Sequence, residues 1–204
     1  MAVLVLDVDG VVIRGHREGG RWDKNLERDL GIAPLALQEN FFRPHWRRIA
    51  AGDADMRAVL DSVWPQMACA ASASAFVEYW FAADSAVDGE ALTLVDAWRG
   101  AGNFAALATV QEHGRADYIW RTLGLKSHFD DLLYSAALGA AKPDAEFYAR
   151  AFAKLPARTP GEILFLDDHP PNVEAASAAG WQARHYRGID DLRATLRSSA
   201  SQSD

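Results

Sequence analysis

The chain has 204 residues, half of them hydrophobic, which is enough to bury one sizeable core with an inserted subdomain, or two small domains. Its net charge of −7, with Lys and Arg spread along the chain, argues against nucleic acid as a partner, because binding phosphates needs clustered cations. Cys69 is the only cysteine, which excludes an internal disulfide framework and a cysteine-based zinc site. No signal peptide precedes the first apolar run and no run reaches membrane length, so we expect a cytoplasmic protein without a membrane partner.

The first apolar run, residues 2–6, predicts a buried strand because it is short, rich in Val and soon followed by a glycine. Asp7 and Asp9 stand at its end. Side chains two apart on a strand point the same way, so both carboxylates are expected at the strand's carboxyl end, where open α/β sheets bind ligands. Two such charges about 4 Å apart repel by roughly 4 kcal/mol near a protein surface, so a positive group must lie beside them. On this stretch alone, a turn in which both residues only cap the next segment explains the pattern equally well.

Two glycine-rich polar breaks, residues 15–20 and 84–90, enclose a stretch whose pattern is helical throughout. Asp53 is the expected N-cap of one helix, and a second helix precedes the later break. The apolar stripes of these two helices are Met56, Val59, Leu60 and Val63, and Ala75, Phe76, Tyr79 and Trp80. We assign residues 16–88 to a helical insert.

Beyond Glu90, helix and strand patterns alternate. Strands are expected at residues 104–109, 132–135, 163–168 and 182–186, and helices through Trp98, up to Leu123, over 147–155 and from Asn172 to Gly180. This alternation predicts an α/β fold, a doubly wound, Rossmann-like parallel sheet with helices on both faces. Residues 1–15 and 89–197 then form the α/β core, and residues 198–204 a disordered tail.

Residues with functional chemistry stand at three further strand or loop ends, namely Thr109, Lys142, and the pair Asp167 and Asp168. Pro143 disfavours helix at Lys142, which places this lysine in a loop before the next helix. Together with Asp7 and Asp9, the edge of the sheet carries four carboxylates and one ammonium group. A divalent cation offsets this charge, and hard oxygen ligands with room for water and phosphate suit Mg²⁺.

In this order, the motifs Asp-x-Asp-Gly, Thr, Lys-Pro and Asp-Asp resemble the haloacid dehalogenase-like hydrolase superfamily. The segments LDVDGVV, LAT, AAKPD and LFLDDHPPNVEAA carry the resemblance, which covers the whole chain except the tail. The insert resembles the small helical cap of that superfamily. Within it, the sequence is most similar to sugar-phosphate phosphatases and to the phosphatase domain of soluble epoxide hydrolase, which also end a strand with paired Asp. The resemblance implies a Mg²⁺-dependent hydrolase of small phosphomonoesters, with a phosphorylated metabolite as its partner.

The resemblance implies a role for each residue of these motifs. Asp7 would be the nucleophile that forms an aspartyl-phosphate, and Asp9 the general acid and then the base. Thr109 would hold a phosphoryl oxygen, and Lys142 would orient Asp7 and stabilise developing charge. The implied Mg²⁺ ligands are Asp7, the carbonyl of Asp9 and Asp168, the favoured member of its pair, with Asp167 and Asn172 behind them.

The sequence departs from the superfamily's pattern at Val110, where an Asn that hydrogen-bonds in the phosphate region is common. A hydrogen bond to a charged group is worth about 1.5 to 3 kcal/mol, so its absence is expected to slow turnover roughly ten- to a hundredfold. Backbone N–H groups from Val110 onward, at the start of the following helix, are still expected to bind the phosphate.

Three other functions fit parts of the pattern. A 2-haloacid dehalogenase-type hydrolase belongs to the same superfamily but lacks the second acid that Asp9 supplies. A phospho-accepting receiver domain also uses Asp, Thr, Lys and a metal, but its paired acids come early and no helical insert interrupts it. A catalytically weak member with a binding role is favoured only by Val110. The basic residues of the insert either attract an anionic leaving group or form a solvated helix face; they are Arg43, His45, Arg47 and Arg48.

Overall fold

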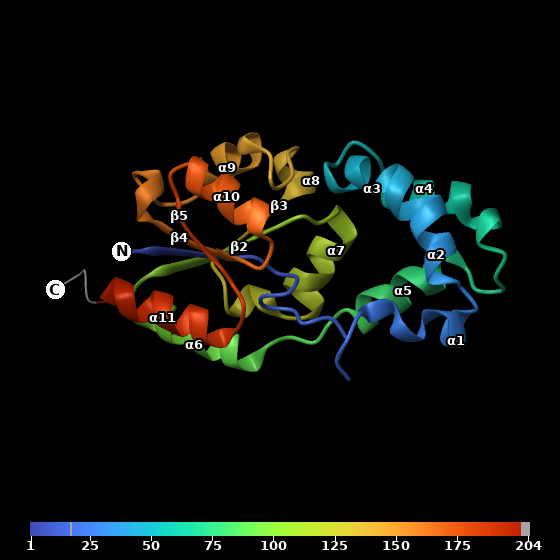
Figure 1. The fold of residues 1–204 in the computed structure, drawn as a ribbon, viewed down its shortest axis with the longest axis horizontal. Helices are drawn as coiled ribbons and strands as arrows, with labels where there is room; N and C mark the ends of the chain where they lie inside the picture. The colour runs from blue at the N-terminus through green and yellow to red at the C-terminus, as the bar shows by residue number, and fades with distance from the viewer. Residues whose placement is uncertain (17, 201–204) are drawn as a thin grey trace.

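A parallel sheet forms the centre of the molecule. The computed structural model describes residues 1–16 and 18–200, without the side chains of residues 199 and 200. The strands are β1 (Val3–Leu6), β2 (Phe104–Thr109), β3 (Asp131–Tyr134), β4 (Ile163–Asp167) and β5 (Gln182–His185). They pair in the order β3-β2-β1-β4-β5, all parallel (Figure 1). The predicted α/β fold is confirmed.

Helices cover both faces of the sheet (Figure 1). On one face, α6 (Gly89–Gly100), η4 (Tyr118–Thr122) and α11 (Ile189–Ala200) share a core with Leu4 and Leu6. On the other face, α9 (Ala145–Phe152) and α10 (Pro170–Ala178) share a core with Val3 and Val5. Successive side chains of β1 therefore enter opposite cores, as the period of two requires. Shorter segments complete this unit: α7 (His113–Asp117), η5 (Leu125–Ser127), α8 (Ser135–Leu138) and η6 (Pro160–Glu162).

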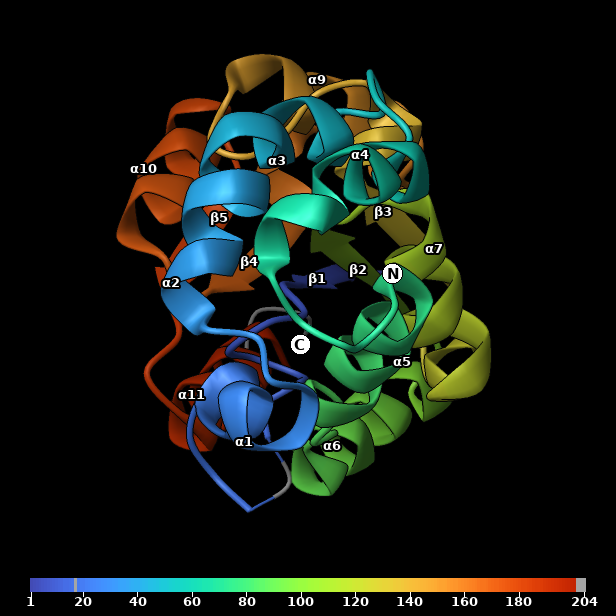
Figure 2. The same ribbon diagram turned by 90° about the vertical axis from the view of Figure 1, so that its right-hand side faces the viewer.

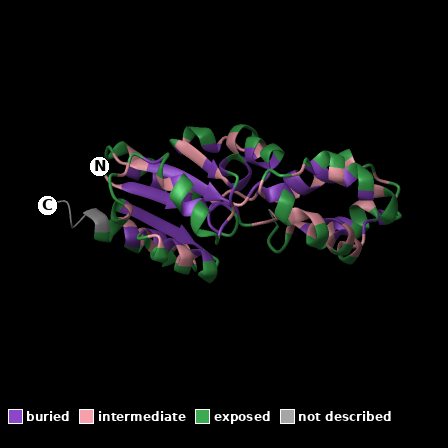
Figure 3. Ribbon diagram, turned by 90° about the horizontal axis from the view of Figure 1, so that it is seen from above, coloured by how far each residue is buried: buried purple, intermediate pink, exposed green. Residues whose placement is uncertain are grey.

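The insert between β1 and α6 is helical and has a hydrophobic core of its own. Its segments are η1 (Trp22–Asn25), α1 (Leu26–Leu30), α2 (Pro34–Leu37), η2 (Gln38–Phe42), α3 (Arg43–Ala50), α4 (Met56–Val63), η3 (Trp64–Met67) and α5 (Ala73–Ala83). Figure 2, viewed from the side of the insert, places these helices in front of the sheet. Figure 3 shows buried residues gathered separately in the sheet and in the insert. The insert therefore lies over the carboxyl ends of the strands.

One π-turn interrupts the helix that runs from Pro34 to Ala50. Pro44 has no N–H to offer the carbonyl of Asn40, and its ring crowds that carbonyl. The chain widens just before the proline, so that the N–H of Arg43 donates to the carbonyl of Gln38, five residues back. The proline thus explains the position of η2.

Two helix ends differ from the sequence expectation. The N-cap of α4 is Asp55, not Asp53, because the cap directly precedes the first helical residue, and the Asp55 carboxylate accepts from the N–H of Ala58 at 2.7 Å. At the other end of the chain, α11 continues to Ala200, so residues 198–200 of the expected disordered tail are helical. Residues 201–204 of that tail lie outside the described residues.

The chain crosses between the sheet and the insert twice, and the two crossings pair with each other. Ile13 and Val87 form an antiparallel bridge, and the N–H of Arg14 donates to the carbonyl of Ala86 at 2.9 Å. We call the paired residues 12–15 and 86–88 the connecting ribbon. The exact domain boundaries stay a prediction. Among the described residues, no helix combines the length and apolar character that a membrane span requires.

Candidate active site

The strand order brings the expected site residues to one edge of the sheet. β1 lies between β2 and β4, and Leu6 is level with Leu107 on one side and Leu166 on the other. Asp7 directly follows β1, and its N–H donates to the carbonyl of Leu166 at 2.9 Å. Thr109 and Asp167 end the two neighbouring strands. Residues distant in sequence thus meet because parallel strands end at a common edge.

Lys142 connects the ends of three neighbouring strands through its ammonium group. Its ammonium lies 2.8 Å from Asp7 Oδ1 and 2.6 Å from Asp167 Oδ2, and it donates to the carbonyl of Ala108 at 2.9 Å. Burial alone would lower the pKa of Lys142, but the two carboxylates outweigh it and the pKa is raised. The lysine therefore remains charged and has three oxygen partners for its three protons.

The surroundings of Asp7 disfavour its ionised form. Burial is the main cause that raises the pKa of the Asp7 carboxyl, Lys142 opposes it, and Asp167 and Asp9 add repulsion. Asp7 thus shares one ammonium group with Asp167, and three carboxylates lie close together at this edge.

The two members of the Asp pair have different surroundings. Asp167 is fully buried; besides Lys142, its carboxylate accepts from the backbone N–H of His169 at 2.9 Å and from Asn172 Nδ2 at 3.0 Å. Asp168 reaches the surface, but protein atoms displace part of the water around its carboxyl group. This loss of water, followed by repulsion from Asp167, raises the pKa of Asp168. Its carboxylate lies over Gly10, where an added Cβ would be 2.1 Å from Oδ2. The Asp168 carboxylate thus packs against Gly10 in a space that only a glycine leaves open.

Three of these carboxylates can hold a metal ion. One oxygen each of Asp7, Asp167 and Asp168 lies within 4.8 Å of the others. This set offers hard oxygen ligands on a surface that opens to a cavity, which fits Mg²⁺ with its preference for a few carboxylates and several waters. Because Asp167 already accepts from Lys142 and Asn172, Asp7 and Asp168 are the members with more free lone pairs.

Asp9 lies beside Asp7 and is fixed by a residue that the sequence analysis missed. Gln111 Nε2 donates to Asp9 Oδ2 at 2.5 Å and to Thr109 Oγ1 at 3.4 Å. Protein atoms around the carboxyl group displace water and, together with repulsion from Asp84, raise the pKa of Asp9 to about 6. The charges of Arg115 and Lys142 and the hydrogen bond from Gln111 lower this pKa but do not offset the rise. At neutral pH Asp9 is therefore closer to gaining a proton than an ordinary aspartate.

Two cavities meet at Asp9. The larger, of about 1180 Å³, exposes Asp7, Asp9 and Asp168 and extends past Arg14 and Trp22 of the insert side. The smaller, of about 280 Å³, begins at Asp9 and Val110 and extends into the insert between aromatic side chains. Thr109, Lys142, Asp167 and Asn172 are buried and line neither cavity.

Three of the backbone N–H groups that follow Val110 have partners within the protein. The N–H of Gln111 donates to Ser135 Oγ at 3.0 Å, and those of Gly114 and Arg115 donate to the carboxylate of Glu112. Glu112 is the N-cap of α7 and adds a negative charge there. Phosphate binding by this segment therefore stays a prediction, which rests on the N–H groups of residues other than Gln111, Gly114 and Arg115.

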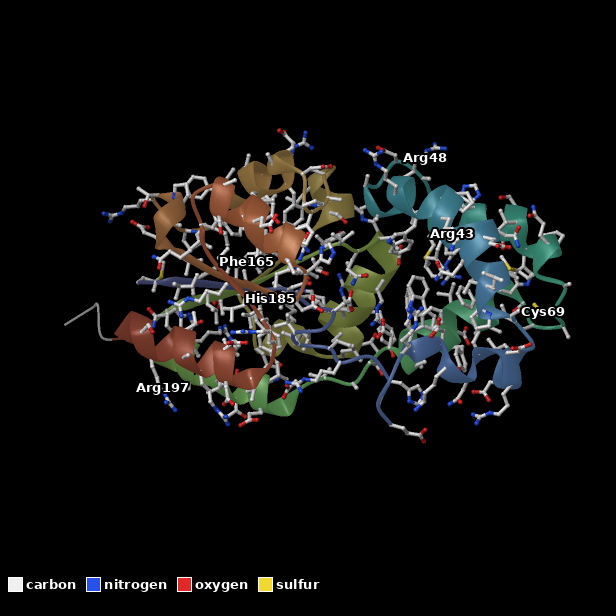
Figure 4. All side chains as sticks on the ribbon, in the orientation of Figure 1. Arg43, Arg48, Cys69, Phe165, His185 and Arg197 are labelled. Carbon is white, nitrogen blue, oxygen red and sulfur yellow. The ribbon has the colours of Figure 1, made fainter. Side chains whose placement is uncertain are left out.

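Gln111, Arg115 and His185 also belong to this region, and sequence analysis found none of them. Gln111 stands two residues after Thr109, so the alternation used for Asp7 and Asp9 would have found it. Arg115 is buried and donates to the carbonyl of Phe81 at 3.0 Å and to that of Asp84, at the end of α5. His185 lines the larger cavity, with Nε2 at 3.0 Å from the carbonyl of Asp168 (labelled in Figure 4). The last two depend on tertiary contacts that no local pattern signals.

The sequence and the fold both match known proteins. The family model of haloacid dehalogenase-like hydrolases matches residues 1–180. A predicted haloacid dehalogenase-like (HAD-like) family hydrolase from Porphyromonas gingivalis has a similar structure, with 19% identity, a TM-score of 0.77 and coverage of 97% of this chain and 98% of that chain. A HAD family enzyme from Bacteroides thetaiotaomicron in a magnesium complex shares 20% identity, with a TM-score of 0.76 and coverage of 93% and 96%; it is also known with magnesium and inorganic phosphate.

A dehalogenase is similar as well. L-2-haloacid dehalogenase from Xanthobacter autotrophicus, with chloropropionic acid covalently bound, shares 18% identity at a TM-score of 0.63, covering 89% of this chain and 75% of that chain. Comparison with curated proteins gave no match. At these identities the similar structures establish the fold alone.

Proposed function

Because this chain belongs to the haloacid dehalogenase-like hydrolases, we propose that it hydrolyses small phosphomonoesters with the help of Mg²⁺, through an aspartyl-phosphate on Asp7. One observation carries the proposal: Asp7, ion-paired with Lys142 at 2.8 Å, shares a cavity with a second carboxyl, Asp9, whose pKa is raised to about 6. A nucleophile and a proton donor at one edge are what cleavage of an ester with a poor leaving group needs.

The proposed reaction has two steps. In the first, an oxygen of Asp7 attacks phosphorus, the bond to the alcohol oxygen breaks, and Asp9 gives its proton to that oxygen. In the second, Asp9 takes a proton from water as the water oxygen attacks phosphorus, and the bond to Asp7 breaks. Gln111 holds Asp9 Oδ2, and we assign the proton transfer to the other oxygen, Oδ1. The products are the alcohol and inorganic phosphate, and both aspartates return to their starting states.

Asp7 and Asp168 are the proposed carboxylate ligands of Mg²⁺, together with the carbonyl of Asp9. When bound, this ion would neutralise charge on the phosphoryl group. Asp167 and Asn172 support the site from behind: Asn172 donates to Asp167, and Asp167 in turn holds Lys142. Lys142 orients Asp7, since all three of its protons already have partners.

The experiment measures two products with one preparation. Phosphate release from simple alkyl phosphates is measured with Mg²⁺ and with a chelator, and chloride release from 2-chloropropionate is measured in parallel. We expect phosphate release that requires Mg²⁺, and no chloride release. Chloride release without phosphate release would assign the chain to the dehalogenase reaction instead.

A further inference from the structure

The smaller cavity is walled by four aromatic side chains from separate segments of the insert. They are Trp22 of η1, Phe42 of η2, Trp46 of α3 and Trp80 of α5. The rings of Phe42, Trp46 and Trp80 lie 5.4 to 5.6 Å apart, edge to face, and Trp22 is 5.6 Å from Trp80. Edge-to-face contacts hold rings in fixed orientations, so this wall is ordered without a ligand.

Three of these four rings are more exposed than a core requires, whereas Trp80 is buried. Phe41 and Phe76 of the same insert are fully buried, whereas Trp22, Phe42 and Trp46 are only partly buried. The π-turn contributes to this arrangement, because both of its end residues, Gln38 and Phe42, line the cavity. Such turns often occur at functional sites. The insert therefore presents apolar ring surface to the cavity in addition to its own core.

Among the described residues, the rest of the wall carries no cation free to bind an anion. Val110 adds apolar surface, and Asp9 and Asp84 are acidic. Arg115 is the one cation that the described part of the chain contributes to this cavity. It donates to the carbonyls of Phe81 and Asp84 and lies 3.6 Å from the Asp84 carboxylate.

The basic residues of α3 lie elsewhere. Arg43, Arg47 and Arg48 of α3 are exposed and line neither cavity; Figure 4 labels the first and last of them on this helix. The expectation that they attract an anionic leaving group therefore finds no support in their position.

The cavity opens at the residue that would protonate the leaving group. Asp9 lines both cavities, so an alcohol oxygen beside Asp9 would have its phosphoryl group toward Asp7 and its carbon chain directed toward the aromatic wall. A cavity of about 280 Å³ is suited to one or two rings. Building on the proposed function, we propose that this aromatic cavity binds the leaving group and selects alcohols with an uncharged aromatic or similarly apolar ring over sugars and over alcohols with a second anionic group.

The test compares esters of equal chemical reactivity. 2-Phenylethyl phosphate, ethyl phosphate and glucose 6-phosphate are all esters of primary alcohols, so their differences report binding of the leaving group. We expect kcat/KM for 2-phenylethyl phosphate to exceed the other two by about 10- to 100-fold. In Trp46→Ala the ratio of 2-phenylethyl to ethyl phosphate should fall toward about one, and Trp46→Phe should restore most of it.

Trp64→Ala is the matched control. Trp64 belongs to the same insert, but its indole donates to the carbonyl of Ala71 and it does not line this cavity. Loss of folded protein in this variant lowers both rates equally and leaves their ratio at the wild-type value. Equal kcat/KM values for the esters in the wild type, or an unchanged ratio in Trp46→Ala, would overturn the proposal.

A second readout separates this proposal from the proposed function. 2-Phenylethyl phosphonate and ethyl phosphonate cannot be hydrolysed, and their binding is measured by thermal unfolding with Mg²⁺. We expect the wild type to bind 2-phenylethyl phosphonate at least about tenfold more tightly than ethyl phosphonate. In Trp46→Ala the two compounds should bind with similar affinity. If neither ester is hydrolysed but this difference persists, the phosphatase assignment fails and the ring site stands. If the phosphonates bind equally, the ring site fails whatever the turnover.

Discussion

Three acceptors surround the ammonium of Lys142, and this limits what the lysine can do in the reaction. A contact with the phosphoryl group would require it to release Asp7, Asp167 or the carbonyl of Ala108. Orienting Asp7 requires no such exchange. The nucleophile is therefore the residue on which the proposed reaction depends most directly.

Asp7→Asn should remove phosphatase activity by at least about a thousandfold, because an amide oxygen does not form a stable acyl phosphate. The fold should persist, since the amide fills the same volume and removes a buried carboxylate whose pKa is raised by burial. Steady-state kinetics and thermal unfolding of the same sample check both statements. Asp53→Asn, in the insert, is the control for a carboxyl-to-amide change. Activity of Asp7→Asn near that of the control would contradict the assignment of the nucleophile.

Gln111→Leu should lower kcat roughly tenfold, because Asp9 loses the donor that fixes Oδ2 at 2.5 Å. Since a donor stabilises the carboxylate form, its removal should also raise the pKa of Asp9. The pH profile of kcat/KM should then shift to higher pH on the limb that Asp9 governs. Gln182→Leu, an exposed position far from the cavities, is the matched control. A lower kcat with an unmoved profile would show that Gln111 does not act through Asp9.

At the scale of elements, the turn after β1 brings Gly10 directly against the carboxylate of Asp168. Gly10→Ala should weaken Mg²⁺ activation by at least about tenfold, because the added Cβ would meet Asp168 Oδ2 at 2.1 Å. Gly19→Ala is a close control. Both glycines have positive φ, +82° and +79°, but nothing lies within 4 Å of a Cβ added at Gly19. Activity is titrated with Mg²⁺ in both variants. A weaker Mg²⁺ response in Gly10→Ala alone reports the clash with Asp168, and an equal loss in Gly19→Ala would contradict it.

The sequence was sufficient to predict the elements of the sheet because their signals are local. β1, β2 and β4 are short apolar runs, and their carboxyl ends bear the polar residues that the site needs. Order and parallel pairing then bring Asp7, Lys142 and Asp167 together. Helix ends were less certain, since Asp53 and Asp55 are both good cap residues and only the first helical residue decides between them.

Contacts between distant segments were beyond what the sequence could predict. Arg115 looks like any charged helix residue, yet it is buried beneath the end of α5. The apolar residues of the insert predicted a core, but not that Phe42 and Trp46 would line a cavity continuous with Asp9. Periodicity says which face of a helix is apolar and does not say whether protein or ligand covers it.

The whole molecule should respond to pH and Mg²⁺ together. Without metal, displaced water and repulsion from neighbouring carboxylates raise the pKa values of Asp7 and Asp168. The same two causes raise the pKa of Asp9 to about 6. The folded state then holds protons that the unfolded chain has released, so the free energy of unfolding should fall as pH rises from about 4 through about 7.

Mg²⁺ binds the ionised carboxylates, so the stabilisation that it provides should grow over the same range. Thermal unfolding from about pH 5 to about pH 8, with chelator and with Mg²⁺, measures both trends. A melting temperature in chelator that rises through this window, or a Mg²⁺ shift that does not depend on pH, would contradict the charge balance described for this edge.

The connecting ribbon has a consequence for how the sheet assembles. β1 and β2 are neighbours in the sheet, although the whole insert separates them in the chain. The bridge between Ile13 and Val87, with the ion pair of Arg14 and Asp88, closes that long loop at its base. Once the ribbon has closed, β1 and β2 are joined by a short crossover through α6. The further entropy lost in pairing the two strands then no longer depends on the length of the insert. The insert can therefore lengthen, shorten or change its sequence while the strands that carry Asp7 and Thr109 still find each other.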